Sequence, residues 1–186
     1  MPLQLITPPA IEPVTLEEAK AHLKIDTTDD DTLITALIAA ARARAEWHTG
    51  RAFVTQSWVL WLDCWPERNC VEIPLPPSQA VTQLTTYAVD DTATVLDASL
   101  YQVDAASAPA RVTLKSPALA ANARALNAIA IAFDAGYGDH ASDVPQAIRT
   151  AILEIVADLH ANRGDASLDP PQAALALLAP YRIFKL

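Results

Sequence analysis

The residues best suited to chemistry in this chain are two cysteines and four histidines, and their spacing forms no known site. Cys64 and Cys70 have five residues between them and no histidine nearby, which does not fit zinc-ligand spacing. We expect two reduced thiols, with a disulfide across a hairpin as the alternative. No HExxH-type pattern or neighbouring nucleophile accompanies any of the histidines: His22, His48, His140 and His160. We therefore expect no metal and no cofactor.

Carboxylates are the next candidates for catalytic or metal-binding residues. Glu154 and Asp158 are four residues apart, so one helix face would carry both, as an acid–base pair or a metal site requires. More often such a pair is solvated or forms salt bridges. The acidic run at 29–31 suggests a calcium loop, but the central glycine and distal glutamate are absent. Capping of the helix that follows is the expected role of this run.

Motifs for phosphate binding and for nucleophilic catalysis are also missing. The peptide AGYGDH at 135–140 has too few glycines for a phosphate cradle and is typical of a turn. The chain has no G-x-S-x-G, Walker or Rossmann pattern. The sequence therefore favours a protein that is not an enzyme.

The composition and net charge of the chain argue against some further classes of function. The 186 residues are 52% hydrophobic and carry a net charge of −9. Tight nucleic-acid binding needs clustered Lys and Arg, and with four lysines in the whole chain we expect none. No apolar run is long enough to span a membrane. The N-terminus lacks the features of a signal peptide, which favours a cytoplasmic product.

The segment from Asp143 to Gly164 is the clearest helix in the sequence, and it must position much of the rest of the chain. Pro145 suits its first turn and Gly164 its C-terminal stop. One side of this helix carries a regular apolar arc, while Leu153 and Ala157 lie on the other side. Apolar surface on two sides predicts packing on two sides.

Two helices are predicted before it. Thr15 and Glu18 form a capping box at the start of a helix over 16–23. The second helix runs over 31–48 and ends at Gly50, which suits a left-handed C-cap. One of its faces carries only small residues, so another backbone could approach it closely: Ala36, Ala39, Ala40 and Ala43.

The middle third has the two-residue period of strands. Residues 53–63 are rich in β-branched and aromatic types, with Trp58, Leu60 and Leu62 on one face and Trp61 on the other. Further short strands are predicted over these ranges: 71–74, 81–89, 95–96, 100–103, 111–114 and 128–133. The pattern indicates a mostly antiparallel β module of five to seven strands.

Together these elements predict an α+β fold, a small bundle of three to four helices with an inserted, mostly antiparallel β module. A last short helix over 172–178, begun by the peptide DPPQ and stopped by Pro180, precedes the end of the chain. We expect a single domain over 1–186. Its parts are an extended N-terminal arm, a helical bundle in two segments, a β insertion and a C-terminal tail: 1–13, 14–50 with 143–178, 51–135, and 179–186.

Five segments, taken in order, resemble a known family. They are PVTLEEAKAHLKID, DDDTLITALIAAARARAEWHTGRA, TQSWVLWLD, VPQAIRTAILEIVADLHANRG and ALLAPYRIFKL. The family they resemble is that of bacteriophage head–tail connector proteins, the adaptors directly beneath the portal. It includes the adaptor of gene transfer agents, the phage-like particles of some bacteria. The resemblance covers nearly the whole chain, although the β middle matches in pattern rather than in residues.

The resemblance implies a structural adaptor in the neck of a virion or phage-like particle, made in the bacterial cytoplasm. Family members form a ring, commonly of twelve subunits, between the portal protein and a tail-side stopper or head-completion protein. DNA passes through the ring without specific binding, which suits an acidic lumen. Their C-terminal tails engage the portal, and this assigns portal contact to the last six residues: Tyr181, Arg182, Ile183, Phe184, Lys185 and Leu186.

A ring also needs subunit contacts, and these join two different faces of neighbouring copies. The small face of the 31–48 helix and the second apolar side of the 143–164 helix are the candidates. The residues predicted to make these subunit contacts are Ala36, Ala39, Ala43, Leu153 and Ala157.

The alternative function is a small cytoplasmic enzyme or a ligand-binding module with its site in the β insertion. Trp58, Trp61 and Trp65 could form such a binding surface. Tryptophans at alternating strand positions more often pack in a core or an interface.

Overall fold

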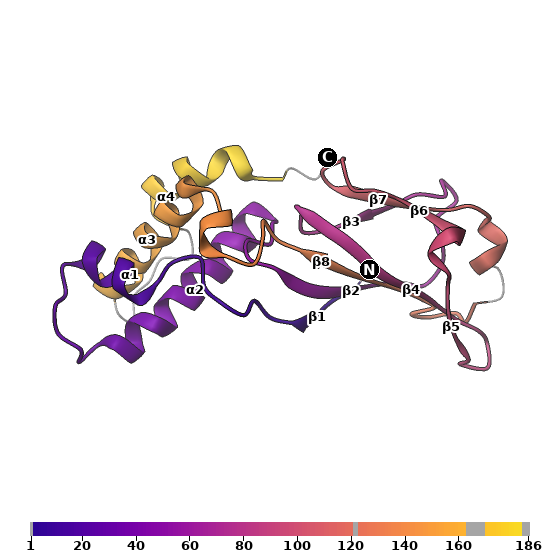
Figure 1. Ribbon diagram of the computed structural model, residues 1–186, viewed down its shortest axis with the longest axis horizontal. Coiled ribbons are helices and arrows are strands. Elements are labelled where there is room, and N and C mark those ends of the chain that lie inside the picture. Colours follow the sequence, from indigo (N-terminus) through magenta and orange to yellow (C-terminus); the bar gives the residue numbers. More distant parts are fainter. Residues whose placement is uncertain (1, 121–122, 163–169, 184–186) are drawn as a thin grey trace. The chain divides into compact units, whose positions relative to one another are not determined.

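The computed structural model describes residues 2–120, 123–162 and 170–183 (Figure 1). Over these residues it contains four α-helices and two antiparallel sheets, so the predicted α+β class is confirmed. The chain folds into two compact units. The first, called the β unit here, comprises Met1–Pro9 and Thr55–Gly136; the second, the helical unit, comprises Ala10–Val54 and Tyr137–Leu186.

The larger sheet of the β unit has five strands, which lie in the order β1–β2–β8–β4–β5. Their bounds in that order are Leu3–Thr7, Gln56–Leu62, Ile129–Ala135, Ser78–Tyr87 and Ala93–Val95. The central strand, β8, places Ile131 opposite Leu60 on one side and opposite Leu84 on the other. All three side chains are buried. The register therefore puts alternate residues of neighbouring strands into one apolar layer, as the two-residue period predicts.

The smaller sheet has three strands in the order β3–β7–β6, with bounds Val71–Ile73, Ala110–Leu114 and Tyr101–Asp104. Val112 of β7 is fully buried and pairs with Val71 and Val103. Asp104 closes the turn between β6 and β7. Hydrogen bonds from Arg111 and Ser107 lower the pKa of its carboxyl to about 2.

One predicted strand boundary needs correction, and one segment predicted only as extended is part of a sheet. The strand expected over 53–63 begins at Gln56, because Phe53 and Val54 are buried in the core of the helical unit. Tertiary burial outweighs β propensity at these two positions. The arm expected over 1–13 contains strand β1, in which Leu3 pairs with Leu60. The prolines of the arm predict its extended backbone but not its partner strand.

The helical unit contains α1 (Leu16–Leu23), α2 (Asp31–Thr49), α3 (Gln146–Ala161) and α4 (Gln172–Leu178). Helix α3 packs against α1, α2 and α4. The fully buried residues of the shared core include Ile34, Ile148, Ile152, Ile155 and Leu178. In the described parts of the chain, no helix has the length and apolar character needed to cross a membrane.

The helix ends follow the predictions in part. The capping box is confirmed, because the Glu18 amide donates to the Thr15 hydroxyl and the Thr15 amide donates to the Glu18 carboxylate. Gly50 is left-handed, with φ of 70°, as predicted. Pro145 lies at the N-cap of α3 rather than in its first turn. Pro171 is the N-cap of α4, and the predicted stop at Gly164 lies outside the described residues.

The expected capping role of residues 29–31 is wrong for Asp30, the N-cap of α2, which makes no side-chain capping bond. Its carboxylate lies 3.6 Å from Nε2 of His160, at the end of α3. Asp31 forms a salt bridge of 2.6 Å with Lys20 of α1. The Lys20 ammonium takes the Asp31 carboxylate because a charged donor binds a carboxylate more strongly than a backbone N–H does.

Candidate functional site

The C-terminal segment is held on the helical unit up to its last described residue. Leu178 is fully buried, and the Tyr181 side chain packs against the same core. The Arg51 Nε donates a hydrogen bond of 2.5 Å to the Tyr181 carbonyl. The Ile183 amide donates one of 2.9 Å to the Thr49 carbonyl. Tyr181 and Ile183, two of the six predicted portal-contacting residues, are therefore bound to the turn after α2.

The remaining tail residues differ in what the structure describes. Arg182 is exposed and its amide donates to the Ala179 carbonyl. Phe184, Lys185 and Leu186 lie outside the described residues. Thr49 and Arg51 belong to the HTGRA peptide, which is part of one of the five segments that resemble a known family. The sequence predicts no role for this turn.

Helix α2 presents the small face that its sequence predicts. Ala36 and Ala43 are exposed and Ala39 is half-buried. Trp47 continues this face at the end of the helix, and its side chain is 82% exposed. Sequence reasoning missed Trp47, although its spacing of four residues from Ala43 and eleven from Ala36 places all three on one helical stripe. The exposed stripe from Ala36 to Trp47 carries no charge.

Helix α3 is less open than expected on its second side. Leu153 is half-buried and packs against the core of its own unit. Ala157 is half-buried as well. Of the two predicted subunit-contact faces, the α2 face is the more exposed.

The carboxylates of α3 have different partners. Glu154 lies 4.0 Å from Nε2 of His22 on α1. Asp158 accepts a hydrogen bond from the Asn162 side chain through its Oδ1. The contact of Glu154 fits a helix-surface residue, whereas the Oδ2 of Asp158 is buried and has no hydrogen-bond partner among the described residues.

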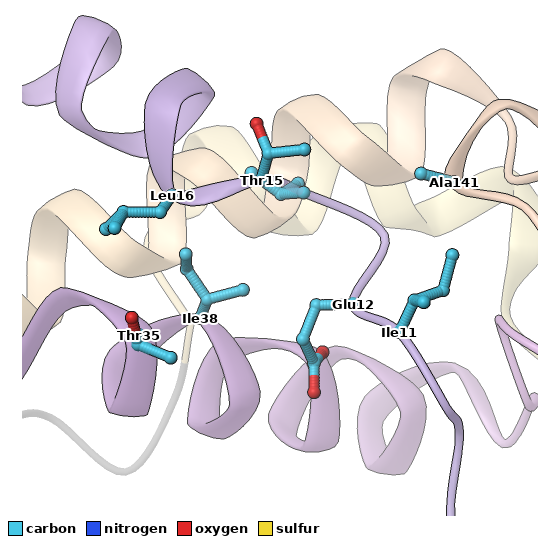
Figure 2. Close-up of a pocket in the computed structure, with 8 residues that line it drawn as sticks. Ile11, Glu12, Thr15, Leu16, Thr35, Ile38 and Ala141 are labelled. Carbon is cyan, nitrogen blue, oxygen red and sulfur yellow. The ribbon is translucent and has the colours of Figure 1, made fainter. Parts of the chain in front are cut away.

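The helical unit contains an apolar hollow of about 350 Å³. Figure 2 shows the residues that line it. Helix α2 lines one side through Thr35 and Ile38, and the segment before α1 crosses the other side. The one titratable side chain in its lining, Glu12, forms a salt bridge of 2.7 Å with Arg42 of α2. Converging titratable groups, which an active site requires, are not present in this hollow.

Arg42 joins three parts of the helical unit. It binds Glu12 in the segment before α1 and Glu46 one turn further along α2, at 2.7 and 2.6 Å. The other oxygen of Glu46 accepts the Phe53 amide. This network fixes the chain after α2, where the tail also docks.

The two cysteines and the glycine-containing AGYGDH turn are the remaining candidates from the sequence. Cys64 and Cys70 are free thiols. Within the described ranges, no three His, Cys, Asp or Glu side chains lie close enough together to hold a metal ion. In the AGYGDH turn, a Cβ added at Gly138 would lie 2.2 Å from an Asp143 carboxylate oxygen. Close packing inside the turn therefore accounts for this glycine.

A known protein family matches about half of this chain. Residues 13–106 match the family described as phage gp6-like head–tail connector protein. No curated protein matches the chain.

Three solved chains have the same fold over the whole length. A chain from the neck of an empty gene transfer agent (GTA) particle computed with C6 symmetry is 22% identical, with a TM-score of 0.82. A chain from the virion of a native GTA particle is 21% identical, with a TM-score of 0.81. A chain from the neck of a native GTA particle computed with C12 symmetry is 22% identical, with a TM-score of 0.74. Each comparison covers 100% of this chain and 97% of the other.

Proposed function

This chain belongs to the phage gp6-like head–tail connector family, and on that premise we propose that it is a structural adaptor in the neck of a phage or phage-like particle. The observation that carries the proposal is the family match over residues 13–106, half of the chain. The fold shared with neck chains of GTA particles supports it. The protein is non-catalytic, and the alternative of an enzyme or ligand-binding module gains no support from these comparisons.

The adaptor forms a ring, with twelve subunits as the expected number, between the portal protein and a tail-side stopper or head-completion protein. The small bundle of three to four helices and the inserted β module act as one adaptor domain in this ring. The exposed face of α2 supplies one side of the contact between neighbours, through Ala36, Ala39 and Ala43. On α3, Leu153 and Ala157 supply the other side. Trp47 extends the α2 face, because its exposed indole gains most from burial by a neighbour.

The C-terminal tail, residues 181–186, makes the contact with the portal. Its sequence YRIFKL combines aromatic, aliphatic and basic side chains, and such apolar surface is stabilised when a partner covers it. Helix α4 and the docked Tyr181 hold the start of the tail on the helical unit. The end of the tail fills a groove of the portal or pairs with one of its strands.

DNA passes through the lumen of the ring without specific binding. The net charge of −9 supports this role, because an acidic wall repels the phosphate backbone and keeps the DNA from adhering. The adaptor is made in the bacterial cytoplasm and ends in the particle neck.

Electron microscopy of the particle tests the location. We expect a ring of this protein directly beneath the portal, and particles without such a ring would overturn the proposal.

Removal of Phe184 to Leu186 tests the tail. Because these residues lie beyond the docked Tyr181 and Ile183, the truncated protein is expected to keep its free energy of unfolding. It should fail to bind adaptor-free particles that carry the portal. Normal binding of the truncated protein would refute the portal role of these three residues.

A further inference from the structure

The turn after α2 holds the start of the tail in a defined position. The Arg51 Nε and the Thr49 carbonyl lie on the two sides of Gly50 and bind the backbone at Tyr181 and Ile183. A Cβ added at Gly50 would lie 3.7 Å from the Ile183 Cβ, which is ordinary contact distance. The two hydrogen bonds flank Arg182, so the backbone direction is fixed on both sides of this residue.

The turn itself is rigid for reasons separate from the tail. The amides of Gly50 and Arg51 both donate to the Glu46 carbonyl. The Phe53 amide donates to the Glu46 carboxylate, which Arg42 also binds. The turn is therefore supported by α2 whether or not the tail is docked.

Arg51 also contacts a second side chain near the tail. Burial raises the pKa of the Tyr137 hydroxyl, while the charge of Arg51 and a hydrogen bond from it act in the opposite direction. The amide of Tyr137 donates to the Phe53 carbonyl. The Arg51 guanidinium thus interacts with both the Tyr137 hydroxyl and the Tyr181 carbonyl.

We propose that Arg51 is a positioning residue that fixes the direction in which the C-terminal tail leaves the helical unit. Tyr181 to Ile183 then form an anchor on their own chain, and Phe184 to Leu186 form the part that reaches the partner. This inference rests on the proposed portal-binding role of the tail. A fixed exit lowers the entropy lost when the tail binds, which favours affinity.

Hydrogen exchange of the Ile183 amide, followed by NMR on the full chain, tests the anchor. The wild-type amide is expected to be protected by its bond to the Thr49 carbonyl. Arg51→Met keeps an unbranched apolar side chain but removes every side-chain donor. It should speed this exchange about tenfold, the effect of losing a hydrogen bond from a charged donor. Arg51→Lys should restore most of the protection.

Two controls separate positioning from general stability. Arg68→Met removes an exposed arginine of the β unit and should leave the Ile183 amide unchanged. The amide of Ile152, in the buried middle of α3, should exchange at the wild-type rate in Arg51→Met. An unprotected Ile183 amide in the wild type, or equal exchange in Arg51→Met and the wild type, would overturn the anchor.

Binding to adaptor-free, portal-bearing particles completes the test. Arg51→Met should bind about tenfold more weakly than the wild type, and Arg51→Lys should recover most of the affinity. Wild-type affinity in Arg51→Met, together with fast exchange at Ile183, would refute the positioning role. If the variant lacking Phe184 to Leu186 binds normally, the portal role of the tail fails, while the Ile183 measurement still decides the anchor.

Discussion

Trp47 offers the sharpest test of the proposed ring. Its side chain is 82% exposed at the end of α2, so Trp47→Ala removes little that the isolated subunit buries. The free energy of unfolding is expected to change by less than about 0.5 kcal/mol, as for most surface substitutions. In the proposed ring, we expect the neighbouring subunit to cover this indole and the same substitution to weaken assembly.

The expected loss follows from the area. A tryptophan side chain has roughly 200 Å² of surface, and covering half of the exposed part buries about 80 Å². At about 25 cal/mol per Å² this contributes ~2 kcal/mol per contact. A closed ring has one such contact per subunit. The concentration needed for half-saturation of the portal should therefore rise roughly 30-fold.

The assay adds purified protein to adaptor-free particles and measures bound protein by mass. Leu126→Ala is the matched control, because Leu126 is a large apolar side chain of the β unit that is 70% exposed. A half-saturation concentration within threefold of the wild type for Trp47→Ala would refute the α2 contact. A large loss of unfolding free energy would refute the inference that Trp47 is dispensable to the isolated fold.

Three further predictions concern stability and charge. Arg42→Met should lower the free energy of unfolding in urea by about 2 kcal/mol, because it leaves the half-buried carboxylates of Glu12 and Glu46 without their cation; a loss no larger than that of Arg68→Met would contradict this. A hydrogen bond from the Thr15 amide, together with Arg149, lowers the pKa of the Glu18 carboxyl below its ordinary value of 4.5. The ionised form of Glu18 therefore stabilises the fold above that pH. This contribution disappears as the pH falls through the lowered pKa. Glu18→Gln should therefore flatten the acid side of the stability–pH curve, and an unchanged slope between pH 5 and pH 3 would argue against the assignment. Fluorescence anisotropy should detect no binding to duplex DNA at physiological salt, whereas micromolar affinity with a steep salt dependence would contradict the charge argument.

Local patterns were sufficient to predict most elements. The Thr15–Glu18 box, the left-handed Gly50 and the alternation through Leu60 and Leu62 depend on neighbours within a few residues, so sequence spacing reveals them. The predicted strand boundary at Phe53 was wrong, because the fate of that side chain depends on a core built from residues about a hundred positions away. The pairing of the N-terminal arm was not predicted for the same reason.

In the candidate site, too, local features could be predicted from the sequence, whereas features that depend on tertiary contacts could not. The small face of α2 follows from helical spacing alone, and Ala36 and Ala43 on it are exposed; their role in a subunit contact stays a prediction. The partly buried state of Leu153 could not be derived, because a second apolar side can face its own unit as easily as a neighbour. Arg51 carried no signal beyond its place in the HTGRA peptide, since its partner lies 130 residues further along the chain.

The sequence by itself determined the α+β class, the apolar periodicity of each element, the acidic balance and the resemblance to head–tail connectors. These properties are local or compositional, and each can be read without knowing which segments meet. Only the tertiary structure decided that the tail begins in a dock formed by Thr49 and Arg51, and that Trp47 remains exposed. Both depend on contacts between distant segments, because burial and hydrogen bonding are set by what the folded chain places against each side chain.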